Sequence, residues 1–308
     1  MTEAARPRVA VVGAGAVGGY YGGVMARAGA AVVMIGRRPF VDAVTANGLR
    51  IDAKHFQATV RVEASTELSA VRGADIVLFC VKTTDNAATA RALAPFLSPS
   101  TVVVSLQNGV DNAEQIRAAS GIDAVPSVVY VAAESMEPGY IKHHGRGDLV
   151  IGPETERHTR LAAQFERCGI PCRVSNNIEG ELWVKLIANC ALNPVSALGQ
   201  AVYGRIAASE DGRKLLDEIS YEVLVVARAA GIVMPGVDDR AAAMAVTMKI
   251  ATQVPEQFSS TGQDLNRGKR TEIDSLNGFI DRRGAALGVP TPVNHAVYTL
   301  VKLLEDRK

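Results

Sequence analysis

Three polar side chains share one face of an otherwise apolar segment, residues 181–194 (ELWVKLIANCALNP). Lys185, Asn189 and Asn193 are spaced at i, i+4 and i+8, which places them in one stripe if the segment is a helix. The apolar residues around them leave almost no face for water, so this helix is expected to be buried all round. Burying an ammonium and two amides costs several kcal/mol unless partners meet them. A solvated or substrate-filled cleft at a domain junction is the simplest source of such partners.

The chemistry that suits this stripe is proton donation. An ammonium facing a cleft can protonate a ketone oxygen while a hydride reaches the carbonyl carbon. Burial of Lys185 would lower its pKa from about 10.4 toward the range in which a general acid works. Such a donor is worth about a hundredfold to ten-thousandfold in rate. The alternative is a structural lysine that pairs with Glu179 or Glu181.

A second polar group of residues lies near the C-terminus. Ser259 and Ser260, with a glycine two residues further on, suit a loop that could hold a carboxylate through hydroxyl and backbone N–H donors. Thr271 is a candidate N-cap for a helix over residues 271–287. Glu272 would then lie in the first turn, where a carboxylate is stabilised with or without a role in chemistry.

The N-terminal part of the chain contains the element that could bring a hydride carrier. An apolar strand over residues 9–12 runs into G-x-G-x-x-G, and the pattern of a helix follows. Strand, tight turn and helix are the context that a dinucleotide-binding turn requires, with the phosphates on the helix N-terminus. The turn would allow a sharp bend at its first glycine, a close approach to a pyrophosphate at its second and tight packing at its third. A glycine-rich surface loop is the alternative. The candidate cofactor-binding residues here are Gly13, Ala14, Gly15, Ala16, Val17 and Gly18.

The end of the next strand favours NADP over NAD. Residues 30–35 (AAVVMI) form a second apolar strand and lead into Gly36, Arg37 and Arg38. A site selective for NAD usually has a carboxylate here, whereas a guanidinium suits a 2′-phosphate. We therefore expect NADP(H) as the cofactor, although Arg37 and Arg38 could also lie on a solvated loop.

Further strands and helices alternate after this point. Residues 75–81 and 101–106 are apolar strands, and residues 84–97 between them have helical spacing. This alternation predicts a parallel sheet with helices on both faces, in which ligands bind beyond the carboxyl ends of the strands. Lys82 and Asn108 follow two such ends, so both are cofactor or substrate candidates. Each could instead be only a turn former.

The remaining pattern divides the chain in two. Residues 49–51 and 58–62 predict a solvent-facing hairpin, and residues 127–151 predict strands with turns at 137–139 and 144–145. The strand pattern stops at residues 175–177. Beyond it, helical spacing covers residues 179–192, 210–230, 240–251, 271–287 and 293–305. The fold class is therefore α/β: an N-terminal Rossmann-type doubly wound, mostly parallel sheet that binds NADP over residues 1–177, then an all-helical substrate and catalytic domain over residues 178–308.

Composition excludes several other classes of function. The 308 residues include 33 basic and 32 acidic side chains, with no basic run carrying interleaved aromatics. No apolar run has the length of a membrane span. These features argue against nucleic acid and membrane partners and for a cytoplasmic protein with a small-molecule substrate. The four cysteines are expected to be reduced, no metal site is expected, and the apolar helices of the second domain could supply a homodimer interface.

Taken in chain order, these residues resemble the ketopantoate reductases, also called 2-dehydropantoate 2-reductases. The resemblance covers nearly the whole chain. It comprises the N-terminal GAGAVG, Lys82, Gln107-Asn108-Gly109, Lys185-x-x-x-Asn189-x-x-x-Asn193-Pro194, Ser259-Ser260, Thr271-Glu272-Ile273-Asp274 and Asn277-Gly278.

The resemblance implies a reaction and a role for each candidate. Hydride would pass from NADPH to the 2-keto group of ketopantoate, giving (R)-pantoate on the route to pantothenate and coenzyme A. The implied roles are general acid for Lys185, alignment of substrate and lysine for Glu272, carboxylate binding for Ser260, substrate contacts for Asn189 and Asn193, proximity to nicotinamide and substrate for Asn108, and the 2′-phosphate region for Arg37 and Lys82.

Two positions depart from the family pattern. Tyr203-Gly204 stands where the family often has Asn-Gly, and Gln257 stands where an Asn often precedes the serines. Losing a partner for a substrate hydroxyl can change discrimination by orders of magnitude. The resemblance therefore supports the reaction type more strongly than the substrate. A related reductase of another 2-keto acid, or a non-catalytic NADP sensor, stays open.

Overall fold

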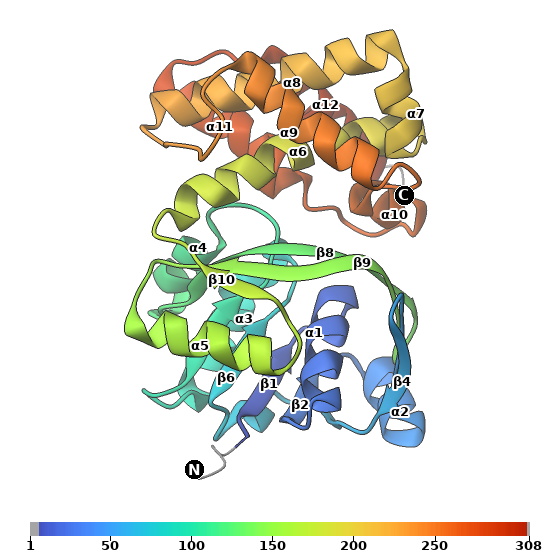
Figure 1. Cartoon of the computed structure of the whole chain (residues 1–308), viewed down its shortest axis with the longest axis vertical. Coiled ribbons are helices and arrows are strands. Elements are labelled where there is room, and N and C mark those ends of the chain that lie inside the picture. The colour runs from blue at the N-terminus through green and yellow to red at the C-terminus, as the bar shows by residue number, and fades with distance from the viewer. Residues whose placement is uncertain (1–5, 307–308) are drawn as a thin grey trace. The chain divides into compact units, whose positions relative to one another are not determined.

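The computed structural model describes residues 6–306, and the chain divides into two compact units, Met1–Ile178 and Glu179–Lys308 (Figure 1). Among the described residues, the first unit contains all the strands and five α-helices, whereas the second unit is helical.

Ten strands of the first unit form one sheet, in the order β4-β3-β9-β8-β7-β6-β1-β2-β5, with β10 paired to β9. Neighbouring strands are parallel except in the pairs β3–β4 and β8–β9. The strands are β1 (Arg8–Val12), β2 (Ala31–Ile35), β3 (Leu49–Ala53), β4 (Phe56–Val60), β5 (Glu63–Ser65), β6 (Ile76–Phe79), β7 (Val102–Ser105), β8 (Val125–Glu137), β9 (Tyr140–Ile151) and β10 (Cys172–Val174).

Helices cover both faces of this sheet. They are α1 (Ala16–Arg27), α2 (Arg38–Asn47), α3 (Asn86–Leu93), α4 (Asn112–Ser120) and α5 (Glu156–Arg167). Alternate residues of β1 point to opposite faces: Val9 and Val11 join a core with α1, α2 and α5, whereas Ala10 and Val12 join a core with α3 and α4. The predicted doubly wound, mostly parallel sheet is confirmed.

Several boundaries in this unit differ from the predictions. The hairpin β3–β4 forms, but only one of its faces meets solvent: Leu49 and Ile51 are fully buried in the core with α1, whereas Arg50 and Thr59 are exposed. No turn forms at residues 144–145, since Gly145 pairs with Ala132 across an irregularity in the β8–β9 ladder. Helices α2 and α4 were not predicted.

The second unit consists of helices packed on one another. They are α6 (Ile178–Gly199), α7 (Tyr203–Ala208), α8 (Glu210–Ala229), α9 (Arg240–Gln253), α10 (Ser260–Asn266), α11 (Asn277–Leu287) and α12 (Pro292–Glu305). The prediction that a helix spans residues 271–287 is wrong in its first part. A short 3₁₀ turn, Ile273–Ser275, precedes α11, which begins only at Asn277. The predicted loop at Ser260 is instead the first residue of α10.

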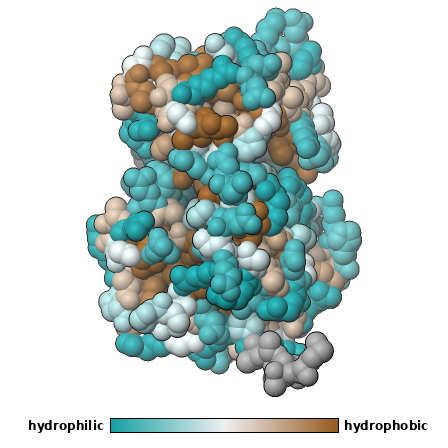
Figure 2. Space-filling view, turned by 60° about the vertical axis from the view of Figure 1, so that its left-hand side comes forward, coloured by the Kyte–Doolittle hydropathy of each residue, from teal (hydrophilic) through white to brown (hydrophobic). Residues whose placement is uncertain are grey.

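The surface is mixed in character. On the face shown in Figure 2, hydrophobic residues form separate patches among hydrophilic ones. The large apolar side chains that are exposed among the described residues are Met136, Val233, Leu300 and Leu303. Within residues 6–306, no helix is both long and apolar enough to cross a membrane.

Candidate active site

The turn between β1 and α1 has the geometry that its glycines predict. Gly13 has a φ of +98°, and a Cβ there would lie 2.7 Å from the backbone of Cys80 and Val81. A Cβ at Gly18 would overlap the carbonyl oxygen of Gly13 and approach Val11 Cγ1 at 2.8 Å. The sharp turn and the close helix–strand packing are therefore confirmed.

Gly15 differs from these two glycines because it faces open space. It is the N-cap of α1, it is exposed, and a Cβ built on it would meet no described atom within 4 Å. The first backbone N–H groups of α1 have no partner within the helix and lie at its positive end. An anionic diphosphate fits this end of α1, and the absence of a side chain at Gly15 lets it approach the backbone.

Arg37 lies beside this turn. The carbonyl of Ile35, at the end of β2, accepts hydrogen bonds from the backbone N–H groups of Gly13 (3.1 Å) and Ala14 (3.2 Å). Arg37 follows two residues later as the exposed N-cap residue of α2. Arg38 is the first residue of α2, and its Nε lies 4.0 Å from Asp42. Both arginines therefore follow the end of β2 beside the turn.

A buried amide network connects the segments that carry Lys82 and Asn108. Gln107 Nε2 donates to the carbonyl of Val81 at 2.7 Å and to Asn86 Oδ1. Asn86 Nδ2 donates to Asn112 Oδ1 at 2.8 Å, and Asn112 Nδ2 donates to the Asn108 carbonyl at 2.6 Å. The network fixes the backbone at the carboxyl ends of β6 and β7, so both candidate side chains start from a rigid edge of the sheet.

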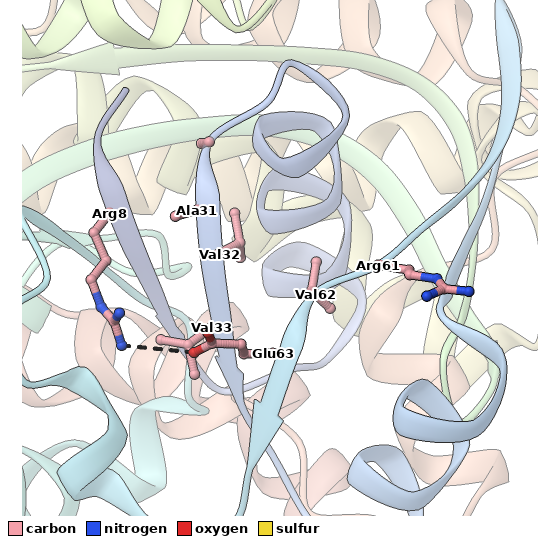
Figure 3. Close-up of a pocket in the computed structure, with 8 residues that line it drawn as sticks. Arg8, Ala31, Val32, Val33, Arg61, Val62 and Glu63 are labelled. Atoms are coloured by element: carbon pink, nitrogen blue, oxygen red, sulfur yellow. Dashed lines mark ion pairs between the residues drawn. The ribbon is translucent and has the colours of Figure 1, made fainter. Parts of the chain in front are cut away.

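A groove of about 380 Å³ lies at the opposite ends of the strands (Figure 3). It is lined by residues at the start of β1, β2 and β5, and Arg8 and Glu63 form an ion pair of 3.7 Å in it. Figure 3 shows the Arg61 guanidinium pointing away from Arg8. Because the groove is at the amino ends of the strands, it is separate from the dinucleotide-type turn.

Helix α6 carries the polar stripe on a buried apolar body. Leu186, Ile187 and Cys190 are at most 1% exposed, whereas Lys185 and Asn189 are half-buried and Asn193 is buried. The helix is longer than predicted, since it continues through Pro194 to Gly199. The structure thus places the three polar residues on one helix, at the spacing of a single stripe.

Pro194 inside α6 leaves one backbone carbonyl of the helix without its usual hydrogen bond, and Asn277 from α11 supplies it. Pro194 has no N–H to donate to the carbonyl of Cys190, four residues earlier. Asn277 Nδ2, at the start of α11, donates to that carbonyl at 3.0 Å. Asn277 Nδ2 also donates to Asn294 Oδ1 at 2.9 Å, and Glu222 accepts from Asn294 Nδ2 at 2.8 Å. These buried contacts fix α6 between Asn189 and Asn193.

The two serines have different surroundings. Ser259 is fully buried; its Oγ accepts from the Gly262 N–H at 3.0 Å as the N-cap of α10 and donates to the Asn193 carbonyl at 2.9 Å. Ser260 is exposed at the first position of α10. Ser259 is therefore structural, and Ser260 is the serine that a ligand can reach.

The segment that carries Glu272 is held by the end of α12. Glu305 Oε1 accepts from both the N–H and the hydroxyl of Thr271, each at 2.6 Å. Asp274 accepts from Tyr298 at 2.9 Å and from Lys302 at 3.1 Å. Thr271 is thus not the N-cap of a long helix, and Glu272 is not in a first turn but is the residue before the 3₁₀ turn.

Some residues around the candidate site were not singled out from the sequence. Asn86, Asn294 and Glu305 hold candidate segments in place through contacts with residues at least 17 positions away, and Asn112 joins this network through Asn86, 26 positions away. A polar residue inside a helical pattern gives no sign of which backbone it will contact, so the sequence offered no signal for them.

A Rossmann-type unit followed by a helical unit with the Lys185 stripe fits an oxidoreductase, and the relatives that match the chain establish this class. More narrowly, the chain belongs to the ketopantoate reductase family. The family model described as ketopantoate reductase PanE/ApbA matches residues 9–156, and the model of its C-terminal part matches residues 177–305.

Individual relatives agree with this assignment. The 2-dehydropantoate 2-reductase of Mesorhizobium japonicum is 32% identical, over 96% of this chain and 97% of the relative. A crystal structure of a PanE/ApbA family ketopantoate reductase from Ralstonia eutropha is 49% identical, with a TM-score of 0.91 over 97% of this chain and 99% of the other. A D-mandelate dehydrogenase in complex with NADH and anilino(oxo)acetate shares the fold at 23% identity, with a TM-score of 0.89 over 97% of this chain and 98% of the other.

Proposed function

We propose that the protein reduces 2-dehydropantoate (ketopantoate) to (R)-pantoate with NADPH, as a cytoplasmic enzyme of pantothenate and coenzyme A biosynthesis. The observation that carries this proposal is the stripe of Lys185, Asn189 and Asn193 on α6 in a chain whose family match extends through both units. Relatives of closely similar length are named for this reaction.

The first unit is proposed to hold the cofactor. The N-terminus of α1 and the open backbone at Gly15 would receive the diphosphate. Arg37 and Lys82 would meet the 2′-phosphate, and Asn108 would lie near the nicotinamide. The cofactor supplies a hydride when bound. NADH in a distant structural neighbour is consistent with a nicotinamide cofactor.

The second unit is proposed to bind and protonate the keto acid. Lys185 would donate a proton to the 2-oxo oxygen as the carbonyl carbon is reduced. Asn189 and Asn193 would contact the polar groups of the substrate, Ser260 would bind its carboxylate, and Glu272 would align substrate and lysine. The buried contacts of Asn277 and Thr271 support these roles because they fix the backbone from which these side chains project.

The test is NADPH oxidation by the full chain with ketopantoate and a panel of branched and unbranched 2-keto acids. We expect turnover of ketopantoate and a loss of kcat of about a hundredfold to ten-thousandfold in Lys185→Ala. Lys249→Ala on the exposed face of α9 is the matched control and should keep wild-type activity. Turnover only of another acid would indicate a related 2-keto acid reductase, and NADPH binding without any turnover would indicate a sensor.

The preference for NADPH has its own test. Arg37→Ala should raise the KM for NADPH about tenfold to a hundredfold, because a charge-assisted bond to phosphate contributes roughly 1.5–3 kcal/mol. Its KM for NADH should stay unchanged. Arg38→Ala is the control, since Arg38 already lies near Asp42. Equal effects of the two substitutions would contradict the assignment of Arg37.

A further inference from the structure

Tyr203 engages the side-chain oxygen of Asn193, the last polar residue of the stripe on α6. Tyr203 is 7% exposed at the start of α7, and its hydroxyl donates to Asn193 Oδ1 at 2.8 Å. Its backbone N–H donates to the carbonyl of Gln257 at 3.0 Å. Burial raises the pKa of the Tyr203 phenol well above its usual range, so the hydroxyl remains a donor.

This contact fixes what Asn193 can offer to a ligand. An asparagine amide has one carbonyl acceptor and an NH₂ group with two donors. The phenol engages one of the two lone pairs of Oδ1 and fixes the orientation of the amide, so the Nδ2 donors are the main groups that Asn193 offers to a ligand. The backbone carbonyl of Asn193 accepts from the buried Ser259 hydroxyl, so the residue is held by its backbone as well as its side chain.

The other departure from the family pattern is also engaged within the protein. Gln257 Nε2 donates to the carbonyl of Phe258 at 2.7 Å, and Gln263 Nε2 donates to the same carbonyl at 3.3 Å. The Tyr203–Gln257 backbone contact joins the two departures in one cluster beside Asn193. The Tyr203 hydroxyl and one N–H of the Gln257 amide are therefore directed at the protein.

The parts of a 2-keto acid differ in what they need from the site. The 2-oxo and carboxylate oxygens accept hydrogen bonds, whereas a hydroxyl on the side chain is bound most selectively when it also finds an acceptor. We propose that Tyr203 is a specificity-determining residue. It keeps the Nδ2 group of Asn193 as a donor to the 2-oxo and carboxylate oxygens of the substrate. It also engages Asn193 Oδ1, the acceptor that a hydroxyl on the substrate side chain would use. The site would then take hydroxyl-free branched 2-keto acids at least nearly as well as ketopantoate. This inference rests on the proposed function.

A pair of substrates isolates the hydroxyl. Ketopantoate and 3,3-dimethyl-2-oxobutanoate differ only in the hydroxyl at C4, so their kcat/KM ratio with NADPH measures its recognition. A site that bonds a substrate hydroxyl rejects the analogue without it by about 10⁴- to 10⁵-fold. We expect wild-type protein to prefer ketopantoate by less than about tenfold. A larger preference overturns the inference while leaving the proposed function intact, and turnover of neither acid overturns both.

Tyr203→Phe tests the residue itself. The substitution keeps the ring and frees Asn193 Oδ1, so the preference for ketopantoate should rise at least about threefold, a change that general loss of stability would not produce. Tyr221→Phe on α8, whose ring packs against Arg240, is the matched control and should leave the ratio unchanged. An unchanged ratio in Tyr203→Phe overturns the inference.

Asn193→Asp covers the case in which Tyr203→Phe does not fold. It keeps an acceptor for Tyr203 but replaces the Nδ2 donor with an oxygen. We expect KM to rise at least tenfold for both acids, because a carboxylate would face their oxygens. An unchanged KM for both would show that Asn193 does not donate to the substrate and would overturn the inference.

Discussion

At the scale of single residues, the turn after β1 separates two uses of glycine. Gly13 and Gly18 lack a side chain because neighbouring backbone leaves no room for one. Gly15 has room for a side chain within the protein, so its lack of one points to a ligand. The same sequence motif thus combines packing and binding, and substitution can distinguish them.

Gly15→Ala should leave the melting temperature of the free protein unchanged and abolish its stabilisation by NADPH. At a concentration of 100 times Kd, NADPH should add about 2.7 kcal/mol to the free energy of unfolding of the wild type. Gly18→Ala should instead lower the stability of the free protein by about 1–3 kcal/mol through overpacking. Thermal denaturation with and without NADPH measures both. Equal destabilisation of the free protein by the two variants would contradict this division.

At the scale of elements, α6 depends on a side chain from α11. Asn277 supplies the hydrogen bond that Pro194 cannot give to the Cys190 carbonyl. Asn277→Ala should destabilise the protein by about 1–3 kcal/mol, because it leaves a buried carbonyl without a partner. In the Asn277→Ala background, Pro194→Ala restores an N–H at that position and should recover part of the loss. Urea denaturation of the single and double variants gives the coupling, and strictly additive effects would refute the pairing.

Helix α12 supports the Glu272 segment in a similar way. Thr271→Val removes the hydroxyl that donates to the buried Glu305 carboxylate. We expect kcat to fall about tenfold, because looser positioning of Glu272 would raise the activation free energy by roughly 1.4 kcal/mol. Thr271→Ser keeps the hydroxyl and should retain wild-type kcat. Steady-state kinetics with ketopantoate checks both variants. Equal kcat values for Val and Ser would show that the contact does not position Glu272.

The elements show what the sequence could and could not predict. Apolar runs such as β1, β2 and β6 and the spacing of α6 and α8 were readable because burial imposes a period on them. The start of α11 was misplaced because Thr271 binds Glu305, 34 residues away, instead of capping a helix. The local pattern did not distinguish Ser259 from Ser260, since only the fold shows which of them is buried, and the choice of Ser260 came from the family resemblance. Local patterns thus predicted elements, whereas contacts distant in sequence decided their ends and the roles of single side chains.

At the scale of the whole molecule, stability should fall in acid. His143 is stacked on Tyr20 at 4.2 Å, with its Nε2 2.6 Å from the Arg146 carbonyl. Burial lowers the pKa of His143 below 6.5, with a smaller effect of His144 and His55, although backbone hydrogen bonds oppose this. The unfolded chain therefore binds more protons as pH falls below 6.5, and the folded state loses stability there.

The second acid-sensitive group acts at lower pH. Burial alone would raise the pKa of Glu305, but hydrogen bonds from Lys302 and Thr271 outweigh it and hold the pKa below 4.5. The contribution of Glu305 to the free energy of unfolding is fully present above pH 4.5 and is lost as the pH falls below that value. Between pH 5 and 6.5 the slope should therefore reflect His143. Urea denaturation over this range should show a flatter pH dependence for His143→Phe than for wild type, and parallel curves would contradict the assignment.

The most direct test of the whole account follows the hydride. Wild-type protein is incubated with ketopantoate and NADPH that carries two deuterium atoms at C4 of the nicotinamide, and the pantoate is examined by NMR and mass spectrometry. We predict one deuterium at C2 of (R)-pantoate, and with Lys185→Ala at most about one hundredth of the wild-type product over the same time. Pantoate without deuterium at C2, or no pantoate from the wild type, would contradict hydride transfer from NADPH to the 2-keto group.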